Sequence, residues 1–421
     1  MEVYVIGGGA AGMFSAIIAA RQGANVTILE KNEKLGKKLY ITGKGRCNLT
    51  NYTSFDEYLS NIISNPKFMY GALKSCDCGF VMDFFEKAGI PLKVERGNRV
   101  FPQSDKSSDI IKALAKELER SFVTIKLNEK VTDIIAENGL IKKIVTDKGV
   151  YFPDKVILAT GGASYPATGS TGDGYNFAKK LGHNIVTLRP ALVGIKLKNV
   201  FYADKSSISL LNMPSLQGLS LKNVELSAIN NDNKKVISKE FGEMLFTSDG
   251  ISGPLGLSLS SKINRLNLNN FSVKIDLKPA LSTEELDDRV LRDFSAQTNK
   301  FFKNCLGGLL PSSLIPFIIK LSKIDENKSV NFITKEERRN LVFLLKNLIF
   351  SISGLDSIEN GIITAGGIDT KEIISSSMRS KIIGNLYFAG EIIDVDALTG
   401  GFNLQIAFAT ANLAGKNITE E

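Results

Sequence analysis

Residues 3–31, VYVIGGGAAGMFSAIIAARQGANVTILEK, give the strongest indication of the fold. Alternation of apolar residues predicts a strand over residues 2–6, small residues predict a helix over 11–22, and a second strand follows over 25–29. A glycine-rich turn separates the first strand from the helix. The chain therefore opens with a βαβ unit.

The glycines of this turn have the spacing G-x-G-x-x-G, formed by Gly7, Gly9 and Gly12. Gly7 permits the tight turn, Gly9 lets the backbone approach a pyrophosphate, and Gly12 lets the helix pack close to the sheet. Ala11 lies in the first turn of the helix, whose free N–H groups and positive dipole end face the phosphates. Glu30, at the end of the second strand, can accept hydrogen bonds from ribose hydroxyls. We predict a dinucleotide site for FAD or NAD rather than NADP.

Two distant segments favour FAD over NAD, because an extended FAD needs contacts around its flavin end. These segments are 155–174, KVILATGGASYPATGSTGDG, and 385–411, NLYFAGEIIDVDALTGGFNLQIAFATA. Either segment alone is as consistent with an ordinary turn between a strand and a helix as with a contact to FAD. Together with the opening motif they predict an FAD site, with Glu391 at the ribityl chain and the last helix directing N–H groups at the flavin N1/O2 edge. The residues expected there are Thr160, Gly161, Gly162, Gly390, Glu391, Gly401, Asn403, Leu404 and Gln405.

Composition excludes several classes of protein. The 421 residues are 43% hydrophobic and 23% charged, which suits two or three folded domains. No apolar stretch reaches the roughly 18 residues of a membrane span, and the N-terminus lacks the basic leading region of a signal peptide. Four cysteines and one histidine predict neither a disulfide framework nor a metal site. We expect a soluble cytoplasmic protein that holds no metal and does not associate with membranes.

The charge balance admits anionic partners without choosing one. The net charge is +8, and residues 31–46 alone hold six basic residues and one acid. A solvated lysine-rich face is the bland interpretation, but the segment directly follows the predicted phosphate-binding unit. No single stretch interleaves lysines with aromatic residues as a nucleic-acid stacking platform would. Binding of nucleic acid is therefore not expected.

Changes in the residue pattern along the chain predict an inserted domain. Short strand-like runs joined by Asn, Asp, Ser and Gly turns start near residue 190, and a helical pattern occupies 278–347. Ser282 and Thr334, each followed three residues later by Glu, predict helix N-termini in the helical part.

A family resemblance rests on four segments, two of them quoted above. The others are GKKLYITGKGRCNLTN (36–51) and GEMLFTSDGISGPLGLSLSS (242–261). With these the chain resembles the BaiN-like or aminoacetone-oxidase family of bacterial NAD(P)/FAD-dependent oxidoreductases over nearly its whole length. The resemblance implies an α/β architecture: a Rossmann-like, glutathione-reductase-like FAD-binding domain interrupted by a β-rich domain that carries a helical insertion. The domains expected are 1–189 with 363–421, 190–277 with 348–362, and 278–347.

The resemblance also implies a set of residues that line the FAD. These are Glu30, Lys31, Lys38, Arg46, Cys47 and Asn48, with Val131 at the adenine side. One departure is Lys44, where members of the family often have glycine.

Four side chains invite a catalytic role, and each has a plainer alternative. Arg46 is a candidate clamp for substrate or phosphate, or a loop anchor. Tyr165 is a candidate for the substrate pocket facing the flavin, or a packed tyrosine. Cys47 has no second cysteine close in sequence, which favours a cofactor-contacting or buried thiol over a redox thiol. His183 follows a predicted helix and is expected to cap it or to start a strand.

These observations predict an FAD-dependent oxidoreductase with a small-molecule substrate. The resemblance implies either NAD(P)H-linked reduction of an enone-like or other hydrophobic substrate, or oxidation of a small amine with formation of hydrogen peroxide. A flavoprotein that binds or modifies RNA is the alternative from another class. With only one dinucleotide motif, a transient NAD(P)H donor would share the substrate cavity near Tyr165 and the 400–401 loop.

Overall fold

The computed structural model describes residues 1–419 and divides into two compact units. Unit 1 comprises Met1–Ala191 and Ile358–Glu421, and unit 2 comprises Leu192–Ser357. Residues 420 and 421, at the end of the expected 363–421 segment, lie outside the described residues. Each unit has its own cluster of buried apolar side chains.

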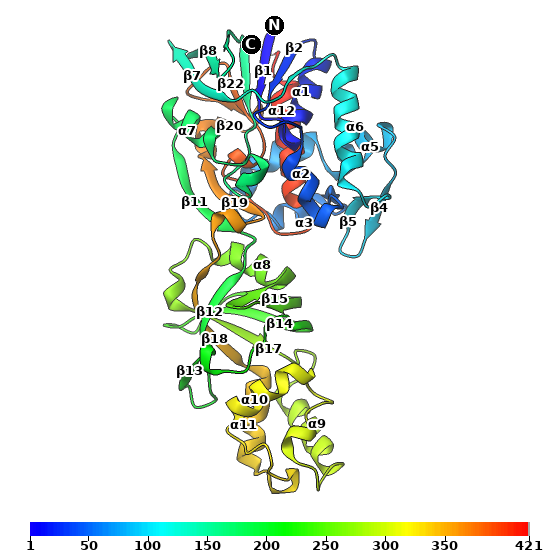
Figure 1. The fold of residues 1–421 in the computed structure, drawn as a ribbon, viewed down its shortest axis with the longest axis vertical. Coiled ribbons are helices and arrows are strands. Elements are labelled where there is room, and N and C mark those ends of the chain that lie inside the picture. The colour runs from blue at the N-terminus through cyan, green and yellow to red at the C-terminus, as the bar shows by residue number, and fades with distance from the viewer. Residues whose placement is uncertain (420–421) are drawn as a thin grey trace. The chain divides into compact units, whose positions relative to one another are not determined.

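Unit 1 is organised by a seven-stranded sheet with the strand order β20-β21-β22-β10-β1-β2-β6 (Figure 1). Strands β22, β10, β1, β2 and β6 run parallel, and β20 and β21 add an antiparallel edge. The strands of this sheet are β1 (Glu2–Ile6), β2 (Asn25–Leu29), β6 (Thr124–Lys126), β10 (Lys155–Leu158), β20 (Ile373–Ile374), β21 (Arg379–Ser380) and β22 (Leu386–Phe388). The opening βαβ unit therefore lies within a mostly parallel sheet, and the C-terminal strand β22 lies two positions from β1.

The first and last long helices pack against each other in unit 1. Helix α1 (Ala10–Arg21) follows β1, and α12 (Phe402–Lys416) follows β22. Gly415 permits the close approach, because a Cβ there would lie 2.7 Å from the carbonyl oxygen of Ser15. Rings of Phe14 and Phe408 pack 5.1 Å apart across the same contact. Both ends of the chain thus build one core.

Smaller elements complete unit 1. A three-stranded sheet, β7-β8-β9, and another, β3-β5-β4, lie outside the main sheet, and β11 pairs with β19. These strands are β3 (Thr50–Asn51), β4 (Leu92–Glu95), β5 (Arg99–Pro102), β7 (Val131–Glu137), β8 (Leu140–Thr146), β9 (Val150–Tyr151), β11 (Ile185–Ala191) and β19 (Ile363–Ile368). The helices are α2 (Lys37–Ile41), α3 (Phe55–Ser60), α4 (Tyr70–Ser75), α5 (Cys78–Lys87), α6 (Ser107–Arg120) and α7 (Asp173–Lys180).

A short break separates helices α4 and α5. Helix α4 ends at Ser75, and Asp77 caps α5 by accepting a 2.8 Å hydrogen bond from the N–H of Phe80. An aspartate favours such a cap over a helix interior, because its side chain competes for backbone N–H groups.

Unit 2 is built on an antiparallel sheet that closes on itself. The strand order is β13-β12-β16-β15-β14-β17-β18, and β12 also pairs with β18. The strands are β12 (Ile195–Phe201), β13 (Ser207–Ser209), β14 (Ser220–Asn230), β15 (Val236–Phe246), β16 (Gly250–Ser252), β17 (Phe271–Asp276) and β18 (Leu348–Leu355). Closure pairs the strand edges that an open sheet would expose.

The helical stretch expected over 278–347 does not form a unit of its own. Its helices are α9 (Thr283–Ser295), α10 (Ile315–Ser322) and α11 (Lys335–Lys346), while α8 (Gly253–Ile263) packs on β15. Capping boxes start α9 at Ser282 and α11 at Thr334, as the sequence predicts. Phe317 of α10 lies 6.2 Å from Phe350 of β18, ring to ring, so the helices share the apolar core of the sheet.

Candidate functional site

The turn between β1 and α1 leaves space for a ligand at one glycine and none at the others. A Cβ on Gly9 would meet no atom within 4 Å, whereas one on Gly12 would lie 1.8 Å from the carbonyl oxygen of Gly7. Gly7 itself has φ +105° and lies against Ala159 at the end of β10. The turn therefore packs tightly below Gly9 and is open at Gly9, where the backbone must approach a pyrophosphate.

Glu30 lies directly beside this turn. Its carboxylate accepts hydrogen bonds from the N–H of Gly8 at 2.6 Å and from the backbone and side chain of Asn32 at 2.8 and 2.7 Å. The N–H of Glu129 donates to the carbonyl of Glu30, which places Val131 at the start of β7 next to the end of β2. The two residues predicted at the adenosine end are thus neighbours.

Lys31 reaches across to the segment after β10. Its ammonium donates to Thr171 at 2.5 Å and to Asp173 at 2.7 Å. The ion pair to Lys31 and its hydrogen bonds lower the pKa of Asp173 against the opposing effect of burial. Lys31 therefore ties the loop 160–173 to the adenosine end.

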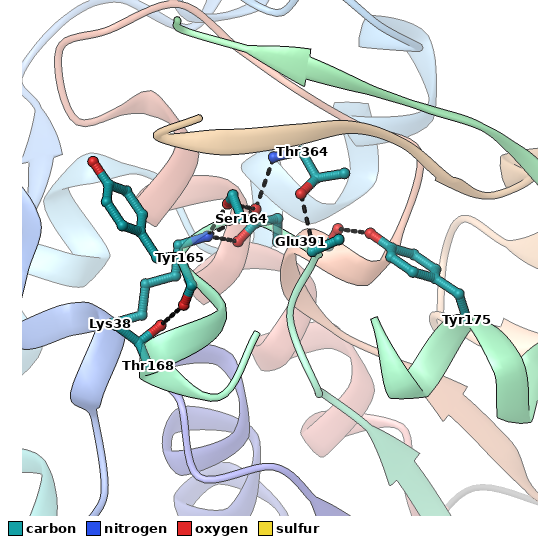
Figure 2. Close-up of polar contacts among 8 residues, drawn as sticks. Lys38, Ser164, Tyr165, Thr168, Tyr175, Thr364 and Glu391 are labelled. Carbon is teal, nitrogen blue, oxygen red and sulfur yellow. Dashed lines mark hydrogen bonds and ion pairs between the residues drawn. The ribbon is translucent and has the colours of Figure 1, made fainter. Parts of the chain in front are cut away.

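A polar cluster assembles at the other end of that loop, and Figure 2 shows its members. Lys38 donates to both carboxylate oxygens of Glu391 at 2.9 and 2.7 Å and to Ser164 at 2.6 Å. The N–H of Thr364 donates to Glu391 at 2.9 Å, and Thr364 Oγ1 accepts from the N–H of Ala163 at 2.9 Å. We call Lys38, Ser164, Thr364 and Glu391 the lysine–glutamate cluster.

In this cluster Glu391 makes contacts that the sequence around it does not indicate. The carboxylate predicted to meet the ribityl chain is bonded to Lys38, Ser164 and Thr364. Its contact with the ribityl chain stays a prediction. Ser164 and Thr364 are absent from the sequence-based candidates. Ser164 lies within a quoted motif, but no motif marks Thr364, because only the pairing of β19 with β11 brings it there.

The N-terminus of α12 forms the predicted flavin end. Gly401 precedes the helix with φ +101°, and a Cβ there would lie 3.0 Å from Asn48 Oδ1. That Asn48 oxygen is buried and has no hydrogen-bond partner within the described chain. An unpaired buried acceptor costs about 1–3 kcal/mol, so a donor from a bound group is expected to satisfy it.

The other predicted residues of α12 hold the protein together around this end. Gln405 is fully buried, donates to the carbonyl of Cys76 at 2.7 Å and accepts from Thr50 at 2.6 Å. Asn403 bonds the backbone of Ala397 through both of its polar atoms, at 2.9 Å each. Leu404 is partly buried against the core. A role of these three side chains at the flavin stays a prediction.

The strand-end glycines meet the opening turn. A Cβ on Gly390 would lie 2.7 Å from Cβ of Ala11, and one on Gly162 would lie 2.7 Å from Glu391. Thr160 follows β10, and its buried Oγ1 has no partner among the described residues. Gly161 has φ +74°. The structure therefore brings the three glycine segments of the sequence to one edge of the parallel sheet, as the topology requires.

Cys47 and Arg46 lie in the loop before β3. Complete burial raises the pKa of the Cys47 thiol to about 12, so the thiol stays protonated. Arg46 binds Glu95 at 2.5 Å and Asp105 at 2.6 Å and stacks 4.2 Å from the ring centre of Phe101. These contacts anchor the loop, and its role as a clamp for a ligand stays a prediction.

Tyr165 and His183 differ in their surroundings. Tyr165 has φ +53°, and its N–H donates to the carbonyl of Glu359 at 3.0 Å. Its ring points away from the lysine–glutamate cluster (Figure 2). His183 lies buried between α7 and β11, 2.8 Å from Ser380 Oγ, and burial lowers its pKa. A place between a helix and a strand is what the sequence indicates for His183.

The residues present fit FAD. Gly9 offers an open approach at the N-terminus of α1 for the pyrophosphate, and Glu30 lies at the end of β2 for the ribose. Asn48 offers an unsatisfied acceptor beside the N-terminus of α12, which suits the imide N–H of a flavin ring. Fold and site together define a Rossmann-type FAD-binding flavoenzyme.

Comparison with known proteins agrees with this class. The profile of the family described as HI0933-like protein Rossmann domain matches residues 1–417, and the chain belongs to this family. Its sequence is 31% identical to the 3-dehydro-bile acid delta(4,6)-reductase of Clostridium scindens over all of this chain and 99% of that protein. The resemblance predicted from the sequence is confirmed.

Two other relatives carry a different name. The ribosomal RNA dihydrouridine synthases of Escherichia coli and Haemophilus influenzae are 28% and 29% identical to the chain. They match 97% and 100% of this chain and 96% and 99% of their own lengths.

Solved structures share the fold at low sequence identity. A 3-ketosteroid delta1-dehydrogenase from Sterolibacterium denitrificans has a TM-score of 0.51 at 14% identity, covering 99% of this chain and 98% of that one. The FrdA subunit of E. coli quinol fumarate reductase has a TM-score of 0.50 at 16% identity, covering 100% and 70%. The protein is an FAD-dependent oxidoreductase. Within residues 1–419, no helix is long and apolar enough to cross a bilayer.

Proposed function

We propose that the enzyme reduces a carbon–carbon double bond conjugated to a carbonyl group, with NAD(P)H as electron donor. The names of its relatives support this reaction. A delta(4,6)-reductase of 3-dehydro bile acids and a dihydrouridine synthase act on different molecules. Both nevertheless saturate a double bond conjugated to a carbonyl. The two enzymes act on different classes of substrate but reduce the same kind of double bond.

The observation that carries the proposal is the unpaired Asn48 Oδ1 beside the N-terminus of α12. An acceptor and a row of helix N–H groups side by side match the donor and acceptors on the pyrimidine edge of a flavin. Bound FAD supplies the hydride chemistry. The helix N–H groups would stabilise negative charge at this edge of a bound flavin.

Thiol chemistry has no support in the chain. Cys47 is held protonated by burial, and Cys47, Cys76, Cys78 and Cys305 are all free thiols. A dithiol relay between nicotinamide and substrate needs two adjacent cysteines of low pKa. Bound FAD would therefore exchange electrons with each substrate without a thiol relay. Free thiols also support the prediction of a cytoplasmic location.

The remaining residues of the site bind the cofactor and orient the loop beside it. The α1 N-terminus with Gly9 binds phosphate, and Glu30 binds the ribose. The lysine–glutamate cluster fixes the loop that carries Tyr165. With a single dinucleotide motif, NAD(P)H and the enone would use one cavity in succession, so ping-pong kinetics are expected.

The test is anaerobic mixing of the holoenzyme with NADH, NADPH and small amines separately. Bleaching of the flavin by a nicotinamide and its reoxidation by an enone, with parallel lines in double-reciprocal plots, is the expected result. Bleaching by amine alone, with hydrogen peroxide released in air, would establish the amine oxidase instead. Intersecting lines with NAD(P)H would overturn the shared cavity.

A further inference from the structure

We propose that Tyr58 and Asn51 are positioning residues that strengthen the N–H groups at the start of α12 and thereby raise the reduction potential of bound FAD. The inference rests on the flavin end at α12 in the proposed function, and it adds two side chains that act on the flavin through the backbone. Neither residue is among those that the sequence predicts at the cofactor. Both are buried, each with an exposed fraction of 4%.

The N–H groups at the start of α12 are available to a ligand. The helix begins at Phe402, and the N–H of Gln405 donates to the carbonyl of Gly401 at 3.2 Å. Within residues 1–419, the N–H groups of Gly401, Phe402 and Asn403 donate to no acceptor, as is usual in the first turn of a helix. The unpaired Oδ1 of Asn48 lies beside Gly401.

Tyr58 donates a hydrogen bond to the first carbonyl of α12. Its hydroxyl lies 2.8 Å from the carbonyl oxygen of Phe402, and the two rings pack edge to face, 4.8 Å apart. Burial raises the pKa of the Tyr58 hydroxyl well above its ordinary value of 10.0, so the group stays a donor at neutral pH. Helix α3, which carries Tyr58, is itself fixed to the segment before α12, because Asn61 accepts a 3.0 Å hydrogen bond from the N–H of Leu398.

Asn51 makes the same kind of contact two residues earlier. Its side-chain amide donates to the carbonyl of Gly400 at 3.0 Å and to that of Gly97 at 3.0 Å. The backbone of Asn51 is fixed by its pairing with Arg99 between β3 and β5. Two side chains from the first 60 residues of the chain therefore end on carbonyl groups at the start of the last helix.

These contacts act on the N–H groups through the peptide bond. A carbonyl and the N–H of the following residue belong to one amide, and resonance couples the two. A hydrogen bond accepted by the carbonyl polarises the amide and strengthens its N–H as a donor, by about 10–30% per bond. The carbonyl of Phe402 shares an amide with the N–H of Asn403, and the carbonyl of Gly400 shares one with the N–H of Gly401. Each side chain thus strengthens one of the available N–H groups.

Stronger donors at this place would favour reduced FAD over oxidised FAD. Reduction adds negative charge at the N1/O2 edge of a flavin, and fixed donors stabilise the charged form more than the neutral one. Loss of the Tyr58 hydroxyl or of the Asn51 amide should therefore lower the reduction potential. General loosening of the structure would instead weaken the binding of both redox states alike and leave the potential unchanged.

The test measures the midpoint potential of the holoprotein during slow anaerobic reduction with dithionite beside a reference dye. Titration of apoprotein gives the affinity for oxidised FAD, which should change little. Tyr58→Phe removes the hydroxyl and keeps the ring contact with Phe402. It should bind reduced FAD about 3-fold more weakly relative to oxidised FAD, since one polarising bond is lost. Tyr58→Phe/Asn51→Leu should show about a 10-fold loss, which lowers a two-electron potential by about 30 mV.

Tyr387→Phe is the matched control. Tyr387 is also buried, and its hydroxyl donates to the carbonyl of Asn417, at the opposite end of α12, at 3.3 Å. Removal of a buried hydroxyl should lower the thermal midpoint in both tyrosine variants. The reduction potential should fall in Tyr58→Phe and stay at the wild-type value in Tyr387→Phe.

Two results would overturn the role of the two residues: an unchanged potential in both Tyr58→Phe and Asn51→Leu, or an equal fall in Tyr387→Phe. Asn48→Ala then shows which statement fails. If this variant loses affinity for FAD, the flavin end lies at α12 and only the strengthening of the N–H groups is refuted. If it binds FAD as wild type does, the placement of the flavin end fails as well. Dithionite replaces both NAD(P)H and the enone, so the outcome is independent of the substrate reaction.

Discussion

The β1–α1 turn and the lysine–glutamate cluster are built in opposite ways, although both lie at one edge of the same sheet. The turn uses residues 7–12 and a single acid 18 residues further on, and its chemistry is mostly backbone. The cluster joins Lys38 to Glu391, 353 residues apart, and its chemistry is in side chains. One site is local in sequence, and the other exists only in the folded chain.

This difference shows which physical feature each region depends on. The turn depends on the space that a Cβ would occupy. A single methyl group can therefore block the approach of the pyrophosphate without altering any side-chain contact. The cluster depends on mutual neutralisation of charge, so removal of one partner leaves the other unpaired. Substitutions should therefore affect cofactor binding in the turn and stability in the cluster.

The largest effect is expected at Gly9. Gly9→Val should abolish FAD binding while the protein stays folded, because a Cβ there meets no protein atom and φ −79° suits valine. The measurement is flavin absorbance per chain together with the thermal midpoint. Gly12→Ala is the contrasting variant: its Cβ would lie 1.8 Å from a backbone oxygen, so the fold itself should be destabilised. A Gly9→Val protein that keeps FAD would contradict the assignment of the turn.

The second effect tests the cluster. Lys38→Met leaves the Glu391 carboxylate without its cation in a region where both side chains are about 20% exposed. The free energy of unfolding should fall by about 1–3 kcal/mol, less than for a fully buried pair because solvent screens it. Adding Glu391→Gln should recover part of this loss in chemical denaturation. If the double variant is as unstable as the sum of the singles, the pair does not act as a unit.

The third effect returns to the local site. Glu30→Ala should weaken FAD binding by roughly 1.5–3 kcal/mol, the scale of a hydrogen bond to a charged group. Titration of apoprotein with FAD measures it, and Glu30→Gln keeps the volume as a control. If both variants bind FAD as tightly as wild type does, Glu30 does not hold the ribose. It would then serve only to accept hydrogen bonds from the N–H groups of Gly8 and Asn32.

The smallest effect is a pH dependence from the loop between the two regions. Burial raises the pKa of the Cys47 thiol to about 12 from its ordinary value of 9.0. Above pH 9 the unfolded thiol loses its proton and the folded one does not, so the stability that burial provides falls as pH rises toward 12. Denaturant unfolding at pH 8 and pH 10 should show this fall, and Cys47→Ala should show less of it. A thiol that reacts rapidly at pH 8 in the native protein would contradict the burial.

The βαβ opening, the cofactor class and the capping of α9 and α11 could all be predicted from the sequence. Each of these depends on residues within one or two turns of chain, where backbone sterics and hydrogen bonding act directly. It also indicated that three glycine segments converge, because parallel strands end at a common edge. Lys44 shows the same local logic: it has φ +59° at a position where the family often has glycine.

The contacts between distant side chains, by contrast, became known from the fold. It bonded Glu391 to Lys38, brought Thr364 to the same carboxylate, and paired Asn51 with Arg99. It also merged the helices of residues 278–347 into the core of the unit 2 sheet. The physical reason is that packing and charge pairing depend on distance in space. Sequence separation does not constrain that distance once a chain folds back through a crossover sheet and a closed barrel.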